Sequence, residues 1–217
     1  MATAAQTCPD PANWQGTSAY PLFVDPGQYL AFRAGGRVFG PVKRHFEERA
    51  IRLCLDGLSG IRTVIDAPCG PGRLFPYWQS RGWVVTGVDL SAPMVEAAAG
   101  WQAQAQVPWR TARGDAFRLR EATGTTADLV ACVRFCYYFG QARRIELLRS
   151  LALASRQYVL VQYKTWETCR GARTCRRTRR KHGLAGKQFC SYAEIAREVE
   201  AAGLQCVRIQ PVGFLSD

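Results

Sequence analysis

The sequence predicts an α/β protein built on a doubly wound, mostly parallel sheet. Segments with strand character alternate with helical segments from residue 63 to residue 209, and this order is typical of βαβ units. The segment 83–88 is almost entirely apolar, as expected for a strand that is covered on both faces. Glycines and acidic residues follow directly after strands, which is where parallel sheets bind their ligands.

The N-terminal quarter of the chain has a different pattern. Residues 1–20 show no hydrophobic periodicity, so we expect a loose arm there, followed by a short helix over 27–34. A longer helix is predicted over 42–58, because apolar residues recur in it at helical spacing. These residues are Val42, Phe46, Ala50, Leu53, Cys54 and Leu58. We therefore divide the chain into an arm with lid helices (1–58) and a main domain (59–217).

The main domain is expected to hold six strands that are linked mainly by helices. The strands are β-branched or apolar runs, predicted over 63–65, 83–88, 109–112, 127–133, 157–163 and 204–209. The helices are predicted over 74–80, 92–103, 143–154 and 191–202. Ser91 can cap the second of these helices, whereas Ser191 and Glu194 form a capping box for the last one.

Positive charge is concentrated in one part of the main domain. The segment 164–187 holds nine Lys or Arg residues and one Glu, a net charge of 9 − 1 = +8, so that 12 − 8 = +4 remains for the rest of the chain. Arginine side chains suit phosphate and carboxylate groups, so we expect this basic insertion to bind an anion. The candidate residues recur about every three positions: Arg173, Arg176, Arg177 and Arg180.

Composition narrows the class of protein further. The nine cysteines are an odd number and no secretion signal precedes them, so we expect reduced thiols, with neither a disulfide framework nor a metal site. No apolar run reaches the roughly 18 residues that a membrane span requires. These features predict a cytoplasmic protein.

A glycine-containing loop directly follows the first predicted strand. The loop 66–72 reads DAPCGPG, and glycine lets the backbone turn sharply and approach a ligand closely. A dinucleotide-binding loop needs a third glycine, but Phe75 stands at its place, which counts against NAD. Asp89 ends the second strand and Asp115 follows the third. Acidic residues after three successive strands predict a ligand that offers amino and hydroxyl groups.

These motifs resemble those of class I S-adenosylmethionine (SAM)-dependent methyltransferases, which have a Rossmann-like fold. The family's first motif, (D/E)-x-G-x-G-x-G, is matched by Asp66, Gly70 and Gly72, whereas Pro68 replaces its first glycine. The resemblance covers residues 64–133 and extends more loosely to 209. It implies an enzyme that uses SAM as methyl donor and releases S-adenosyl-L-homocysteine (SAH). It also implies a seventh, antiparallel strand, for which residues 211–217 leave little room.

The resemblance also implies which residues hold SAM. Asp66 would face the amino group, Asp89 the ribose hydroxyls and Asp115 the adenine amine. Tyr29 and Arg33 resemble a tyrosine and an arginine that some family members lay over SAM. The full predicted set is Tyr29, Arg33, Asp66, Ala67, Gly70, Gly72, Arg73, Asp89, Leu90, Met94, Asp115, Ala116, Val133 and Arg134.

The residues that act on the acceptor are less clearly marked. Methyl transfer from a sulfonium mainly requires alignment and exclusion of water, so no catalytic base is assigned. Tyr137, Tyr138 and His45 are weak candidates, and His45 is more simply explained as an exposed helix residue. We expect a small or saccharide-like anionic acceptor at the basic insertion. Two alternatives stay open: a tRNA or rRNA methyltransferase whose arginines bind phosphates, and a non-catalytic SAM-binding interaction domain.

Overall fold

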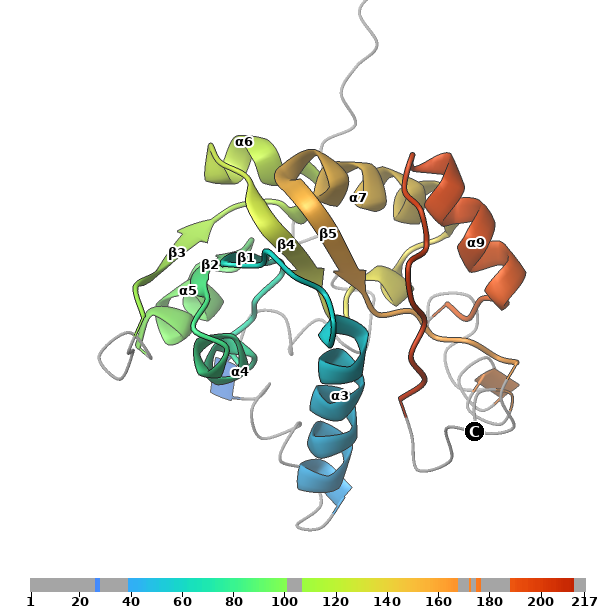
Figure 1. Ribbon diagram of the computed structural model, residues 1–217, viewed down its shortest axis with the longest axis horizontal. Coiled ribbons are helices and arrows are strands. Elements are labelled where there is room, and N and C mark those ends of the chain that lie inside the picture. The colour runs from blue at the N-terminus through green and yellow to red at the C-terminus, as the bar shows by residue number, and fades with distance from the viewer. Residues whose placement is uncertain are drawn as a thin grey trace, which may run out of the picture.

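The fold is seen in a computed structural model that describes residues 26–27, 39–100, 107–167, 172, 175–176 and 188–212. Five strands form one sheet in the order β3-β2-β1-β4-β5, and every neighbouring pair is parallel. This arrangement confirms the predicted doubly wound α/β fold (Figure 1). The strands are β1 (Thr63–Asp66), β2 (Val84–Asp89), β3 (Trp109–Arg113), β4 (Ala127–Cys132) and β5 (Ser155–Val161).

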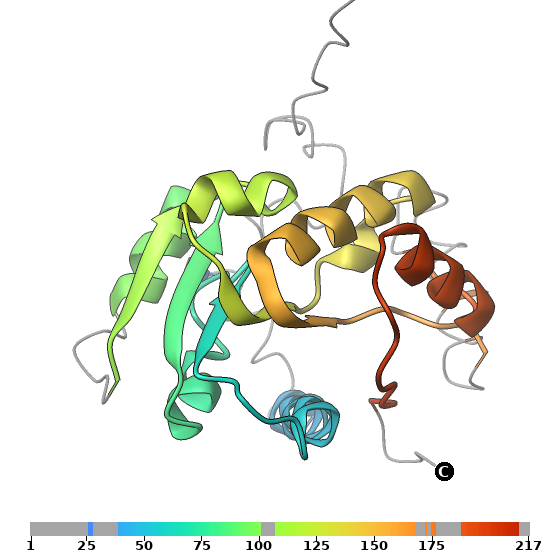
Figure 2. The same ribbon diagram turned by 45° about the horizontal axis from the view of Figure 1, so that its top comes forward.

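Helices cover both faces of this sheet (Figures 1 and 2). The α-helices are α3 (Phe39–Leu55), α4 (Phe75–Ser80), α5 (Ala92–Ala99), α6 (Leu119–Thr123), α7 (Gln141–Ala154) and α9 (Tyr192–Ala201). Two short 3₁₀ helices, η3 (Ala116–Arg118) and η4 (Cys136–Tyr138), follow β3 and β4. No helix in these ranges is both long and apolar enough to span a membrane.

Alternate residues of the strands build two separate cores. Val64 and its neighbours pack with residues of α3, α4 and α5, including the fully buried Phe75 and Trp78. Ile65, the next residue of β1, points to the opposite face and packs with residues of α7 such as Leu147. Burial of each such large side chain stabilises the fold by about 2–3 kcal/mol. Because both faces are covered, a ligand could reach the sheet only at the ends of the strands.

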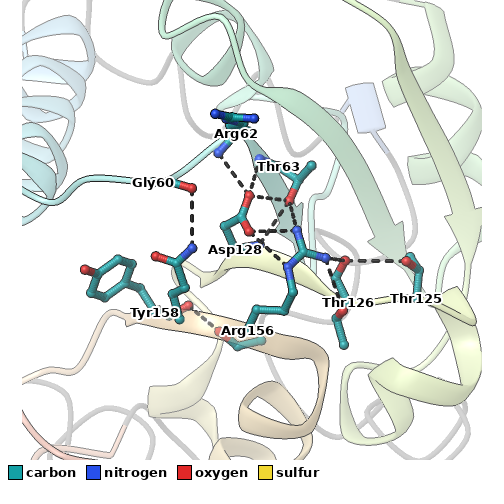
Figure 3. A network of polar contacts seen from close by, with 10 residues as sticks. Gly60, Arg62, Thr63, Thr125, Thr126, Asp128, Arg156 and Tyr158 are labelled. Atoms are coloured by element: carbon teal, nitrogen blue, oxygen red, sulfur yellow. Dashed lines mark hydrogen bonds and ion pairs between the residues drawn. The ribbon is translucent and has the colours of Figure 1, made fainter.

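The amino ends of three strands are fastened by one buried carboxylate. Asp128, in β4, accepts hydrogen bonds from the backbone N–H groups of Arg62 and Thr63 at 3.0 Å each. Its other oxygen accepts from Nε and Nη2 of Arg156, in β5, at 3.0 and 2.7 Å (Figure 3). This cluster lies at the end of the sheet opposite to the loop 66–72, so it fixes the register of the strands without occupying the edge at that loop.

Some predicted elements differ from the observed ones. The helix predicted over 42–58 is α3, which begins and ends three residues earlier. The predicted sixth strand over 204–209 is wrong, since these residues form no strand. Instead Arg208 donates from Nη1 to the carbonyls of Leu53 and Asp56 at the end of α3. The arm 1–20 and the helix over 27–34, apart from residue 27, lie outside the described residues.

Candidate functional site

The loop between β1 and α4 is anchored to both neighbouring strands. The backbone N–H of Ala67 donates to the carbonyl of Ala131 in β4, and that of Cys69 donates to Val88 in β2, both at 2.9 Å. Gly70 and Gly72 have φ angles of +55° and +77°, which glycine adopts at little cost. A Cβ on Gly70 would meet no atom within 4 Å. The loop therefore presents open backbone beside Gly70.

Asp89 connects this loop to the start of α5. One carboxylate oxygen accepts from the backbone N–H of Gly70 and the other from that of Ser91, both at 2.9 Å. Burial raises the pKa of Asp89 to about 6, although these N–H groups oppose the shift. A carboxylate has about four lone-pair sites, and the backbone N–H groups of Gly70, Ser91 and Leu90 are its recorded partners. Asp89 therefore keeps acceptor capacity for a hydroxyl group of a ligand.

Asp66 ends β1 and lies deeper than Asp89. It is 2% exposed, and its Oδ2 accepts a hydrogen bond from the indole Nε1 of Trp78 at 3.0 Å. Burial raises the pKa of Asp66 to about 7, whereas Trp78 and the positive charge of Arg73 lower it. A cationic group nearby would favour the ionised form of this carboxyl.

Asp115 completes a row of three acids along the sheet. Its Oδ1 accepts from the backbone N–H of Phe117 at 2.9 Å and so caps η3. The backbone N–H of Gly114 donates to the carbonyl of Asp89 at 3.0 Å, which ties the loop after β3 to β2. Since the strands lie in the order β3-β2-β1, Asp115, Asp89 and Asp66 follow one another along the carboxyl edge.

Several smaller predicted residues surround this row. Ala67, Met94, Ala116 and Val133 are buried, and Leu90 is partly exposed. Ala67 is fully buried, backbone included, and its N–H already donates to Ala131. Ser91 takes the N-cap position of α5, but its side chain makes no capping hydrogen bond, contrary to our expectation, and its buried Oγ has no partner in the described part of the chain.

The two arginines of the main domain that were predicted to bind the cofactor both contact Glu47, which was not predicted. Arg73 Nη2 lies 2.8 Å from Glu47 Oε2, and Arg134 donates from Nε to Oε1 at 2.6 Å. Burial raises the pKa of Glu47, but the two arginines outweigh it and hold the pKa below its ordinary value. A sequence signal was present: Glu47 stands three and four residues before the apolar Ala50 and Ile51, which is helical spacing.

The weak catalytic candidates lie on two elements, His45 on α3 and the two tyrosines on η4. His45 is exposed on α3. Tyr137 is buried in η4 with its ring 4.9 Å from Nζ of Lys164 and 5.0 Å from the ring of Tyr138. Burial raises the pKa of the Cys69 thiol well above its ordinary value, so this thiol is not poised as a nucleophile.

Much of the predicted acceptor side falls outside the described residues. Of the four arginines assigned to the acceptor, Arg176 is exposed. The other three, Arg173, Arg177 and Arg180, lie outside the described residues. So do Tyr29 and Arg33, which were predicted to bind SAM.

Comparison with known proteins confirms the resemblance predicted from the sequence. Residues 64–157 match the family model of a methyltransferase domain, and this segment runs from β1 into β5. This segment is therefore similar to a methyltransferase domain. The match includes Asp66, Gly70, Asp89 and Asp115, so the row of acids lies within it.

Two curated relatives match part of the chain. The chain is 39% identical over 74 residues to a malonyl-[acyl-carrier protein] O-methyltransferase of Salmonella typhimurium. This match covers 32% of this chain and 30% of that protein. The chain is 42% identical over 77 residues to a trans-aconitate 2-methyltransferase of Mycobacterium tuberculosis, covering 35% and 26%. The chain thus spans less than a third of the curated relatives it matches.

A solved structure extends the comparison of the fold to most of the chain. The magnesium protoporphyrin IX methyltransferase of Synechocystis PCC 6803, crystallised with bound SAH, superposes with a TM-score of 0.63 at 16% identity. The superposition covers 88% of this chain and 86% of that one. At this identity the likeness establishes the fold.

Proposed function

We propose that this protein transfers a methyl group from SAM to a small or saccharide-like anionic acceptor. The observation that carries the proposal is the row of Asp66, Asp89 and Asp115 above a glycine loop, within a segment that matches a methyltransferase domain. The loop would contact SAM through its backbone at Gly70. A cytoplasmic location remains a prediction.

The three carboxylates fit SAM in chemistry and in order. Asp89 keeps acceptor capacity for a ribose hydroxyl, and the φ angle of Gly70 with open space beside it allows close approach. Asp66 would meet the amino group, whose charge favours the carboxylate. Asp115, held as the cap of η3, would meet the adenine amine. Bound SAM supplies a methyl group that its sulfonium has already activated, so the protein has mainly to align the acceptor and exclude water.

Charge supports an anionic acceptor. The basic insertion 164–187 carries a net +8 and follows β5, whose carboxyl end lies at the same edge as the cofactor loop. The two curated relatives are named for malonyl and trans-aconitate acceptors, both of which carry carboxylates. Lys164, at the start of the insertion, lies against Tyr137 and so brings positive charge next to η4.

The proposal is tested by transfer of a labelled methyl group. Purified protein and labelled SAM are incubated with dicarboxylates and tricarboxylates, sugar phosphates and bulk tRNA, and labelled products are counted. We expect transfer to a carboxylate or phosphate metabolite, and loss of transfer in an Asp89→Asn variant. Labelling of tRNA, with binding that weakens steeply in salt, would instead favour the RNA methyltransferase. Binding of SAM without transfer to any of these acceptors would favour the non-catalytic domain.

A further inference from the structure

Three side chains from three other segments contact Glu47, and we call these four residues the Glu47 cluster. They are Glu47 on α3, Arg73 after the glycine loop, Arg134 after β4, and Gln162 after β5. Besides its contacts with the two arginines, Glu47 Oε1 accepts from Nε2 of Gln162 at 3.1 Å. The cluster therefore joins α3 to the loops that follow β1, β4 and β5. It spans the point between β1 and β4 at which the strand order reverses.

The contacts hold both arginines under constraint. The side chain of Arg73 is 8% exposed and that of Glu47 is 4% exposed. Arg134 has a φ of +65°, although it is not a glycine. Such a backbone conformation persists only where surrounding contacts enforce it, and it is frequent at ligand-binding sites. The bond from Arg134 Nε to Glu47 is one of the contacts that enforce it.

The cluster also leaves a donor for an anion. Its two arginines and one glutamate carry a net charge of 2 − 1 = +1. Nη1 of Arg73 is buried and has no hydrogen-bond partner within the described ranges. Burial of a charged donor without a partner is costly. A carboxylate delivered by a ligand would satisfy it, since a guanidinium offers the fork that carboxylates bind.

The position of the cluster suggests which part of the ligand it serves. Asp115, Asp89 and Asp66 occupy the edge from β3 to β1, whereas the Glu47 cluster continues from β1 to β5. Arg73 is close enough to Asp66 for its charge to lower the pKa of that carboxyl. A ligand with adenine at Asp115 and its amino group at Asp66 would bring the adjacent carboxylate toward Arg73.

We infer that Glu47 is a positioning residue that holds Arg73 and Arg134 in place to bind the carboxylate at the amino-acid end of the methyl donor. The inference rests on the proposed function. Glu47 acts through the arginines: its negative charge keeps two guanidinium groups together in a buried space, where they would otherwise repel each other. It also makes the helix α3 part of the cofactor site, although α3 precedes the methyltransferase match.

The test compares two ligands that differ only by the carboxylate. Calorimetry measures Kd for SAH and for decarboxylated SAH with the full chain. We expect Glu47→Gln to weaken SAH about ten- to a hundredfold, the range for hydrogen bonds to charged groups, and to leave decarboxylated SAH within about twofold. Glu48→Gln, which removes the same charge one residue further along α3, should change neither Kd.

A second variant separates binding from folding. Arg73→Lys keeps the charge but loses the fork, so it should weaken SAH and spare decarboxylated SAH even if Glu47→Gln unfolds. Equal weakening of both ligands in these variants would reveal a merely structural role and overturn the inference, as would unchanged SAH binding. If the unmodified protein binds neither SAM nor SAH, the proposed function itself fails, and this outcome is distinct from both of the others.

Discussion

Replacing Asp128 with alanine should destabilise the fold by about 3 kcal/mol, although Asp128 lies far from the cofactor loop along the sheet. The carboxylate receives two backbone N–H groups at the start of β1, the hydroxyl of Thr63 at 2.8 Å, and two nitrogens of Arg156 (Figure 3). Alanine removes every one of these acceptor positions at once. The strands β1, β4 and β5 would lose the hydrogen bonds through which Asp128 joins their amino ends.

The magnitude follows from how buried each partner is. The two backbone N–H groups are partly buried, so losing their acceptor should cost about 1 kcal/mol each. The side chain of Arg156 is 46% exposed, so solvent screens its pairing and limits that contribution to about 1 kcal/mol. Burial raises the pKa of Asp128, but the bonds from Arg156, Arg62 and Thr63 outweigh it and set the pKa at about 2. Since this pKa lies below the unfolded value of about 3.9, the contribution of Asp128 is present above pH 4 and is lost as the pH falls through 2.

Urea unfolding followed by tryptophan fluorescence measures this change in the free energy of unfolding. In thermal unfolding, the same loss should lower the Tm of a domain of this size by about 6–12 °C. Asp56→Ala is the matched control, because Asp56 pairs with Arg81 at 3.8 Å on the surface and should change stability by less than about 0.5 kcal/mol. If Asp128→Ala costs no more than Asp56→Ala, the reasoning from buried hydrogen bonds is refuted.

Three further predictions concern the cofactor site and the acceptor. Affinity for SAH should increase as the pH rises from 5 to 8, because Asp89 and Asp66 ionise at about 6 and 7 and the ligand amine is cationic. Calorimetry on the Asp66→Asn variant should show a shallower dependence of Kd on pH. A Kd that does not change with pH in the unmodified protein would contradict the assignment. Gly72→Ala should cost about 1–2 kcal/mol in stability and also weaken SAH binding, because at a φ of +77° the new Cβ would lie 3.0 Å from the Phe75 ring. The control is Gly82→Ala, at a φ of +73° with open space around the new Cβ. It should cost stability and leave SAH binding unchanged. Charge reversal in the basic insertion should raise KM for the acceptor and spare the Kd of SAM, and unchanged kinetics would exclude this segment as the acceptor site; the positions are Arg176, Arg177 and Arg180.

The sequence predicted the row of acids because the topology leaves few choices. Once strands alternate with helices, the sheet is parallel and the carboxyl ends share one edge. Asp66, Asp89 and Asp115 each follow a strand, so they had to come together. Local chemistry predicted some boundaries equally well, since the capping box of Ser191 and Glu194 is present with both of its bonds.

What the sequence did not predict depends on contacts between distant segments. Glu47 and Arg134 are 87 residues apart, and no local pattern places one against the other. The run 204–209 has the composition of a strand, but strand propensity reflects the pairing that a segment finds, and this segment instead ties Arg208 to the end of α3. The hydroxyl of Ser91 makes no capping hydrogen bond with α5, and Pro93 in the first turn of that helix has no N–H to offer it.

The most direct test of the account is the affinity of SAH for the unmodified chain and for Asp89→Asn, measured by calorimetry. Asp89 bridges the glycine loop and α5 and keeps acceptor capacity for the ribose. We predict binding by the unmodified protein and a loss of about tenfold or more in Asp89→Asn. Glu96→Gln, an exposed change on α5, should bind as the unmodified protein does. Absence of SAH binding, or equal Kd values in all three proteins, would contradict the assignment of this edge as the cofactor site.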